Sequence, residues 1–182
     1  NSRQNNRSSY QNKKLPNELA NLLNKFNDQQ TKVFLAGDDL LKKDLSQVTL
    51  KAIKFAFQDK SFTRELSLWL KPSLKKHKEG LIGENLGMPF LVSLIMPRLI
   101  NKINTSSVQV KMHEEMLANS PIIGVIATEN DDESSWLRVG EIYEEMAVMS
   151  EKEGIATAVL AAPIEIDNYY QELQKILRTN WR

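Results

Sequence analysis

Apolar residues recur along this chain at the spacings that distinguish helices from strands. Leu19, Leu22, Leu23 and Phe26 follow the i, i+3, i+4, i+7 pattern of an amphipathic helix. Further apolar stripes and breaker residues extend this assignment along the chain. The predicted helices cover residues 15–26, 39–59, 61–70, 89–103 (interrupted near Pro97), 108–119, 134–153 and 167–177.

Three short runs of β-branched and other apolar residues have the composition of strands. They cover residues 31–36 (TKVFLA), 121–128 (PIIGVIAT) and 155–160 (IATAVL). The several helices between these runs favour an α+β or α/β arrangement around one sheet. Because strands and helices do not alternate strictly, the order argues against a doubly wound fold.

Proline, glycine and aspartate mark the expected ends of these elements. Pro72 follows the 61–70 helix, and Gly154 is expected to cap the C-terminus of the 134–153 helix. Residues 129–133 form an acidic turn that doubles as an N-cap region. Asp167 is expected to cap the last helix.

Composition and charge are those of one globular domain over residues 1–182. Hydrophobic residues make up 41% of the chain and charged residues 26%. The 24 lysines and arginines nearly balance the 23 aspartates and glutamates, giving a formal net charge of +1. Since nucleic-acid binding depends largely on positive charge, this balance argues against a nucleic-acid partner.

Scarce residue types exclude several classes of site. The absence of cysteine excludes disulfides, zinc–thiolate sites, iron–sulfur clusters and thiol nucleophiles. Two histidines are too few for a histidine-rich metal site, so we predict no metal. The most apolar stretch, residues 88–100, is broken by prolines and is shorter than the roughly 18 residues of a membrane span. With no signal-peptide pattern, these features predict a cytoplasmic protein without a membrane partner.

The common catalytic motifs are missing from the sequence, and no catalytic residue is predicted. His77 lies among lysines and His113 precedes two glutamates, so both are expected on the solvated surface. Glu144 and Glu145 are adjacent on a helix, which does not direct their carboxylates at one another.

Glycines at two places raise further questions. Gly80, Gly83 and Gly87 punctuate a segment that we interpret as a plain loop, in preference to a phosphate-binding loop, because no strand precedes it. Gly140 lies in the middle of the 134–153 helix, where glycine costs roughly 1 kcal/mol relative to alanine. We therefore expect a close packing contact at Gly140.

Two segments have patterns suited to a ligand. In Arg7-Ser8-Ser9-Tyr10-Gln11 a guanidinium stands beside two hydroxyls, which together can bind a phosphate, although the residues taken alone favour a disordered polar tail. The second segment, residues 136–165, is a long helix followed by a strand that ends in Ala161-Ala162-Pro163-Ile164-Glu165. Its small side chains expose backbone groups that can contact the edge of a flat ring, and a buried helix–strand pair is compatible with the same pattern.

These segments together resemble the FMN-dependent nitroreductase family. Trp-Leu-x-x-Gly in the long helix, Gly154, and Pro163-Ile164-Glu165 are similar to the family's central helix and flavin-edge loop. Residues 7–11 are similar to its N-terminal Arg-x-Ser-x-Arg pattern. Arg64-Glu65-Leu66 with Trp69, and the run 120–131, look like the Acg-like branch. The likeness covers most of the chain.

The resemblance implies an α+β sandwich, in which an antiparallel sheet is flanked by helices and FMN is the cofactor. The residues that it assigns to the cofactor are Arg7, Ser8, Ser9, Gln11, Pro163, Ile164 and Glu165. Arg7 and Ser9 would hold the phosphate and ribityl chain, and the last three residues would lie beside the isoalloxazine ring, with backbone amides near its reactive nitrogen. The implied partners are NAD(P)H, a small aromatic acceptor, and either a second copy in a homodimer or a second nitroreductase-like half.

Three departures from the family pattern bear on function. Gln11 replaces a second arginine, a Pro-Ser-x-x-Asn-x-Gln-Pro loop is missing from residues 17–30, and the chain ends where the family continues into a final strand. We therefore expect a fragment, the C-terminal half of a two-half protein. Three functions stay open: an NAD(P)H-dependent nitroreductase, a non-catalytic FMN-binding or flavin-sequestering protein, and a half-domain without flavin that completes a dimer.

Overall fold

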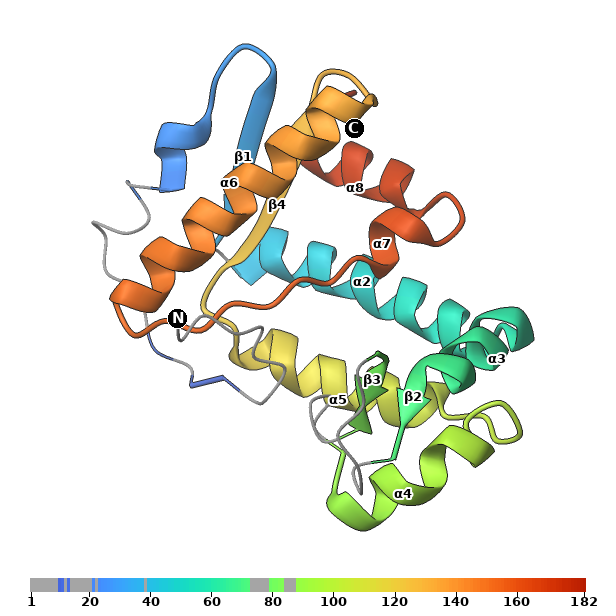
Figure 1. Cartoon of the computed structure of the whole chain (residues 1–182). Coiled ribbons are helices and arrows are strands. Elements are labelled where there is room, and N and C mark those ends of the chain that lie inside the picture. The colour runs from blue at the N-terminus through green and yellow to red at the C-terminus, as the bar shows by residue number, and fades with distance from the viewer. Residues whose placement is uncertain are drawn as a thin grey trace.

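The computed structural model describes residues 10–11, 13, 21, 23–37, 39–72, 79–83 and 88–182. Helices dominate these residues, and a small antiparallel sheet lies among them (Figure 1). In chain order the elements are η1 (Asn24–Phe26), β1 (Thr31–Ala36), α2 (Asp39–Gln58), α3 (Lys60–Trp69), β2 (Leu70–Lys71), β3 (Leu81–Ile82), α4 (Phe90–Leu99), α5 (Ser106–Asn119), β4 (Ile123–Thr128), α6 (Glu133–Lys152), α7 (Ala162–Glu165) and α8 (Tyr169–Leu177).

The main sheet pairs two strands that are distant in sequence. β1 and β4 run antiparallel, with Thr31 opposite Thr128 and Ala36 opposite Ile123. The strands predicted over residues 31–36 and 121–128 are therefore confirmed. A second, smaller sheet pairs β2 with β3 in parallel. The fold class is α+β, as predicted.

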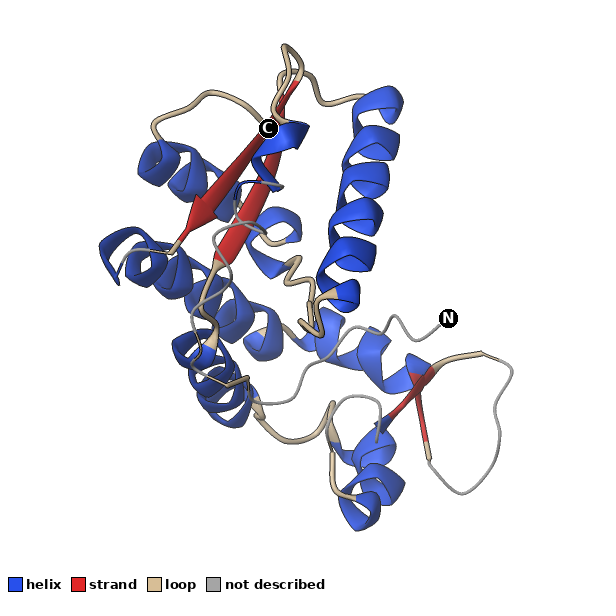
Figure 2. Ribbon diagram, turned by 90° about the vertical axis from the view of Figure 1, so that its left-hand side faces the viewer, coloured by secondary structure: helices blue, strands red, loops and turns tan. Residues whose placement is uncertain are grey.

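Helices cover both faces of the β1–β4 sheet, and Figure 2 shows α6 on one side of the strands with other helices opposite. The buried residues on one face are Ala36, Leu45, Val48 and Leu173, from β1, α2 and α8. Those on the other face are Phe26, Val33 and Ile142, from η1, β1 and α6. Two small apolar cores thus hold the sheet between helical layers.

Five of the predicted helices appear with nearly the predicted bounds, as α2, α3, α5, α6 and α8. In α2 the predicted apolar stripe is buried at Leu45, Val48, Ala52 and Ala56, whereas Phe55 is 46% exposed. Most of the predicted 15–26 helix falls outside the described residues, and its described end is the single turn η1.

The predicted strand over residues 155–160 is wrong. This segment forms no strand and is irregular apart from an isolated β-bridge at Thr157, and the N–H of Ile155 donates to the carbonyl of Ser150 at 2.9 Å. Val159 is 41% exposed, and it lies with Leu160 beside helical residues instead of in the β1–β4 sheet. Strand propensity describes how side chains fit a pleated, half-buried surface, and the local fold gives this segment no such surface.

The caps of α6 are confirmed, but the cap of α8 is not. Asp132 accepts a hydrogen bond from the N–H of Ser135 at 2.8 Å, and Gly154 follows the helix with φ of 68°. The N-cap of α8 is Asn168, whose side chain makes no capping bond. Asp167 is no cap, because its φ of 44° places it in the turn before the helix begins.

The close contact expected at Gly140 is also wrong. A Cβ placed on Gly140 would meet no neighbouring atom within 4 Å. The residues that α6 buries are Ile142, Ala147 and Ser150, while Gly140 faces solvent. Packing therefore does not require glycine at this position, because an alanine methyl group would fit there.

Helix α4 lies at the lower end of the molecule in Figure 1, beside α3 and the β2–β3 pair. It runs through Pro97 without the predicted interruption and ends at Leu99, before the predicted bound of residue 103. Ser93 is its buried residue, whereas Leu91 is 72% exposed and Ile95 is 54% exposed. Within the part of the chain that the structure describes, no helix has both the length and the apolar character needed to cross a membrane.

Candidate functional site

The turn formed by α7 carries three of the residues that the sequence assigns to a cofactor. Pro163 is buried near the start of the turn, Ile164 is 58% exposed, and Glu165 is also exposed. The N–H groups of Ile164 and Glu165 donate to the carbonyl of Ala161 at 2.8 and 3.0 Å. Proline in the first turn is compatible with this geometry because that position needs no amide donor.

A cavity of about 240 Å³ opens beside this turn, and we call it the α7 cavity. Leu160, Ala161, Ala162 and Glu165 form one wall. Helices supply the opposite walls, which are largely apolar. The main helical residues are Ile53, Ala56 and Phe57 of α2, Phe62 and Leu66 of α3, and Met112 and Met116 of α5. Segments distant in sequence thus meet around one apolar space.

Three polar side chains line the α7 cavity: Gln109, His113 and Glu165. The Nδ1 of His113 lies 2.8 Å from the carbonyl oxygen of Gln109. Since a carbonyl oxygen only accepts, Nδ1 must carry the hydrogen in this contact. The prediction that His113 is a solvated surface residue is wrong, because the ring is half-buried on the cavity side of α5.

The α7 cavity has the chemical character of a site for a small apolar group. Ligand sites in proteins are mostly apolar clefts with a few polar groups that orient the ligand. No lysine or arginine is present among the described residues that line this cavity. The arrangement can therefore hold a ring and orient it, but its described walls offer no cation to a phosphate.

Of the cofactor residues predicted in the N-terminal segment, the structure describes Gln11, which does not line this cavity. Arg7, Ser8 and Ser9 lie outside the described residues. Gln11 is exposed, and its carbonyl accepts from the N–H of Lys13 at 2.7 Å. Of the predicted set, Glu165 is the residue that lines the cavity directly.

The spacing along α5 contained a signal for this wall that the sequence interpretation used only in part. Gln109, Met112, His113 and Met116 follow the i, i+3, i+4, i+7 pattern and lie on one helical face. Met112 and Met116 give this face an apolar surface, and Gln109 and His113 bring polar groups to the same cavity wall.

The described glycines of the 80–87 segment have structural reasons to be glycine. A Cβ at Gly83 would lie 2.6 Å from the Cβ of Ser93 in α4, which leaves no room for a side chain. Gly80 has φ of 105°, a left-handed conformation that favours glycine. The interpretation of the whole segment as a plain loop is wrong at Leu81–Ile82, which form β3 between these two glycines.

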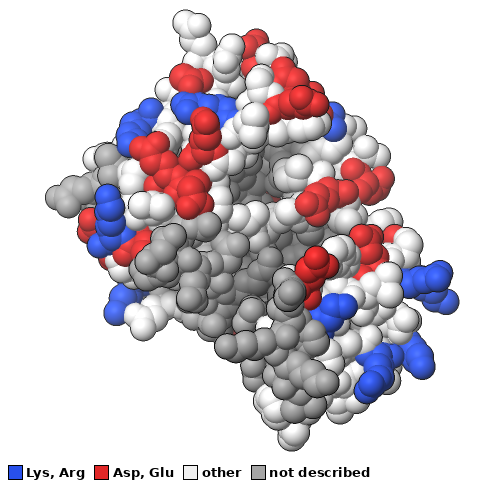
Figure 3. Space-filling model, viewed as in Figure 1, with Lys and Arg blue, Asp and Glu red and all other residues white. Residues whose placement is uncertain are grey.

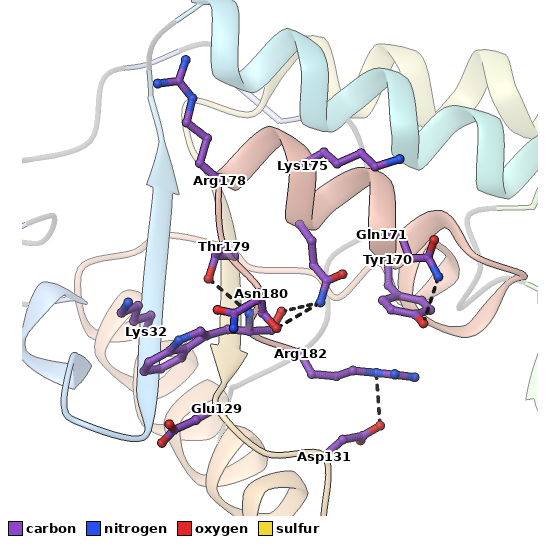
Figure 4. Close-up of a pocket in the computed structure, with 12 residues that line it drawn as sticks. Lys32, Glu129, Asp131, Tyr170, Gln171, Lys175, Arg178, Thr179, Asn180 and Arg182 are labelled. Carbon is purple, nitrogen blue, oxygen red and sulfur yellow. Dashed lines mark hydrogen bonds and ion pairs between the residues drawn. The ribbon is translucent and has the colours of Figure 1, made fainter.

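A second hollow, the C-terminal groove, has a volume of about 820 Å³ and lies between α8, Lys32 of β1 and the loop after β4 (Figure 4). Arg182 lies with its guanidinium 4.1 Å from the ring centre of Tyr170, and its Nε is 3.1 Å from a carboxylate oxygen of Asp131. The ammonium of Lys32 lies 4.1 Å from the Trp181 ring centre. These cations are thus engaged within the protein.

Backbone pairing holds the C-terminal residues in this groove. The N–H of Thr128 donates to the carbonyl of Arg182 at 2.7 Å, and the N–H of Arg182 donates back at 2.8 Å. Two further basic residues, Lys175 and Arg178, point in different directions in Figure 4. Because the positive charges do not converge, the groove lacks the geometry of a phosphate site.

Comparisons with known proteins add no family assignment. No protein-family model matches the chain, and neither a curated protein nor a solved structure matches it. The likeness to nitroreductases therefore rests on the residues of this chain.

Proposed function

We propose that this chain is an FMN-dependent oxidoreductase domain of the nitroreductase type, which uses NAD(P)H to reduce nitro or quinone acceptors. The observation that carries the proposal is the position of residues 160–165. Glu165, from the segment Pro163-Ile164-Glu165 that resembles the family's flavin-edge loop, lines an apolar cavity together with Leu160, Ala161 and Ala162 just before it. A small antiparallel sheet with helices on both faces is compatible with the nitroreductase-like sandwich.

The walls of the α7 cavity fit one end of a flat ring system. A cavity of roughly 150 Å³ is enough for one benzene ring, so a cavity of about 240 Å³ holds only part of a tricyclic isoalloxazine. The rest of the cofactor would extend beyond these walls. Its phosphate is assigned to the segment of Arg7, Ser8, Ser9 and Gln11 by the resemblance alone.

Each described residue of the turn has a positioning role in this proposal. The small side chains of Ala161 and Ala162 would let a ring approach the backbone closely. Pro163 would fix the turn, and Ile164 and Glu165 would lie at the exposed edge of the ring. Bound FMN would supply the hydride and electron transfer, so the chain itself needs no catalytic triad.

The partners follow from the same reasoning. The described walls offer the phosphate no cation, so we propose that a second copy, or a second nitroreductase-like half, completes the flavin pocket. The proposed electron source is a nicotinamide nucleotide and the proposed substrate is a small aromatic acceptor, and the proposed location is the cytoplasm.

The second candidate is a non-catalytic FMN-binding or flavin-sequestering protein. The observation that favours it is the size of the α7 cavity. A space of about 240 Å³ that already holds a ring edge leaves no room for an acceptor beside it. A protein of this kind would bind FMN without turning over NAD(P)H.

Flavin binding is tested first by the absorbance of the purified chain and by FMN fluorescence titration. Ala162→Leu places a larger side chain at the cavity wall, and we expect at least about a tenfold loss of FMN affinity, comparable with losing one well-buried contact. Ala118→Leu makes the same change at an exposed position of α5 and should leave affinity unchanged. A colourless protein that binds no FMN in the titration would refute the proposal.

Two further measurements test the phosphate role of Arg7 and the consumption of NADPH. Arg7→Ala should weaken FMN binding by about ten- to hundredfold if its guanidinium meets the phosphate. Unchanged affinity would show that the N-terminal segment is a polar tail. NADPH oxidation in the presence of a nitroaromatic compound then distinguishes the two candidates, because only the oxidoreductase consumes NADPH.

A further inference from the structure

Large apolar side chains form a continuous part of the surface at one end of the molecule. Those on α4 are Phe90, Leu91, Val92, Ile95 and Leu99, whose exposed fractions range from 37% to 72%. Leu68 and Trp69 at the end of the neighbouring α3 are 67% and 52% exposed. We call this set the α4 surface. Apolar patches of this kind on a protein mark places where something else binds.

The α4 helix differs from an ordinary surface helix, which exposes polar residues to water. Its ten residues, FLVSLIMPRL, include one charged residue, Arg98, and no acidic residue. A helix that is apolar on all sides normally lies buried. Here its outer side chains face solvent, so the free protein exposes apolar surface that a bound partner would cover.

Charge is distributed unevenly between two stretches of the chain. The described residues of 60–102 include five basic residues and two glutamates, whereas residues 129–167 contain eleven carboxylates and two basic residues. Figure 3 shows the carboxylates gathered over α6 and basic side chains at the lower right, near α3 and α4. Arg64, Arg98 and Lys102 are among the exposed cations of this basic end.

This charge pattern determines which occupant fits the α4 surface. In a symmetric pair, each copy would present the same patch, so the basic rim of one copy would face the basic rim of the other. An anionic partner would instead attract the exposed cations around the α4 surface. Its contact with the apolar side chains would remove them from water. Binding to the surface of a lipid bilayer strengthens with the apolar area that is buried and with the electrostatic attraction of cations to anionic lipids.

We propose that the α4 surface docks the protein on an anionic lipid bilayer, with α4 lying in the plane of the membrane. Docking in this way needs no membrane-spanning length, because a helix of ten residues is only about 15 Å long and lies along the surface. The sequence-based prediction of no membrane partner considered spanning segments and did not address surface docking. The proposal is independent of flavin binding.

The test is co-sedimentation of the full chain with two kinds of lipid vesicle. One kind contains phosphatidylcholine alone, and the other contains phosphatidylcholine mixed with phosphatidylserine. We expect binding to the mixed vesicles that decreases as salt is added, and weaker binding to the neutral ones. Failure to bind the mixed vesicles, or equal binding to both kinds, would overturn the proposal.

Matched variants locate the binding surface. Leu91→Asp should reduce vesicle binding by at least about tenfold, the effect of no longer burying one leucine side chain. Leu137→Asp changes a leucine on α6 that is equally exposed, at 73%, and should leave binding unchanged. Equal vesicle binding by these two variants would contradict the proposal.

A charge variant and a measurement without lipid separate lipid docking from self-association. Arg98→Gln removes a charge without adding one to the apolar patch, and should weaken vesicle binding about fivefold, the contribution of one cation near an anionic surface. Light scattering without lipid addresses the alternative occupant. A dimer that Leu91→Asp dissociates would assign the α4 surface to a second copy and overturn lipid docking.

Discussion

Replacing Gly140 by alanine should stabilise the protein. Gly140 lies in the middle of α6, and an added Cβ would meet no neighbouring atom within 4 Å. The methyl group therefore costs nothing in packing. Alanine also restricts the unfolded chain more than glycine does, so less conformational entropy is lost on folding.

The size of this effect follows from helix propensity alone. Glycine is about 0.8–1.0 kcal/mol less favourable than alanine in a helix interior, and an exposed site should show nearly the whole difference. For a domain of this length, a gain of about 1 kcal/mol raises the melting temperature by about 2–4 °C. Circular dichroism in the far ultraviolet, which reports helix content, measures both quantities during thermal and urea unfolding.

Gly154 supplies a matched control for the same substitution. A Cβ at Gly154 would also meet no atom within 4 Å, but this residue has φ of 68°. Alanine in the left-handed region costs roughly 1–2 kcal/mol, so Gly154→Ala should lower the melting temperature. The two variants differ in backbone conformation and not in available space, so their effects should have opposite signs.

A destabilised Gly140→Ala protein would refute this reasoning. It would mean that Gly140 lies against another surface in solution, such as a partner or a bound ligand. Repeating the melts with added FMN distinguishes these cases, because only a ligand contact makes the effect depend on FMN.

Three further predictions concern the core, a helix cap and pH. Leu45→Ala should cost about 2–5 kcal/mol in urea unfolding, because Leu45 is 1% exposed, whereas Leu40→Ala, at a leucine 73% exposed, should change stability by less than about 0.5 kcal/mol. Asp132→Ala should lower the melting temperature by removing the N-cap of α6, while Asp132→Asn should largely preserve it because asparagine also caps. The N–H of Gln30 donates to Asp28 and, with the N–H of Thr31 and nearby Arg138, lowers the pKa of that carboxyl. The Asp28 carboxylate stabilises the fold fully at pH values above its unfolded-state pKa of about 3.9. This stabilisation is lost as the pH falls through the lowered pKa of the folded state. Asp28→Ala should therefore be less stable than the parent protein near neutral pH, and the two melting temperatures should converge in strong acid.

The candidate site could be anticipated only in part. The resemblance selected residues 163–165, and the structure places Glu165 at a cavity wall. The other walls come from α2, α3 and α5, which are far from this turn in the sequence. No local pattern states which helical faces will meet, so the burial of His113 became evident only where the fold brings α5 beside the turn.

Some features were determined by the sequence alone because they depend on neighbouring residues. The helical spacing of Leu45, Val48 and Ala52 and the strand composition of residues 31–36 predicted α2 and β1. Asp132 and Gly154 likewise predicted the ends of α6, since capping is a contact between a residue and the adjacent helical turn.

Tertiary structure decided the features that depend on distant residues. Residues 155–160 have strand composition, yet they lie against helices because the fold places them beside the α7 cavity. Gly140 suggested a tight contact, yet α6 turns that side toward solvent. The apolar α4 pattern predicted a helix but not its exposure. A periodic pattern specifies which residues share a face, whereas burial of that face depends on whether another part of the fold covers it.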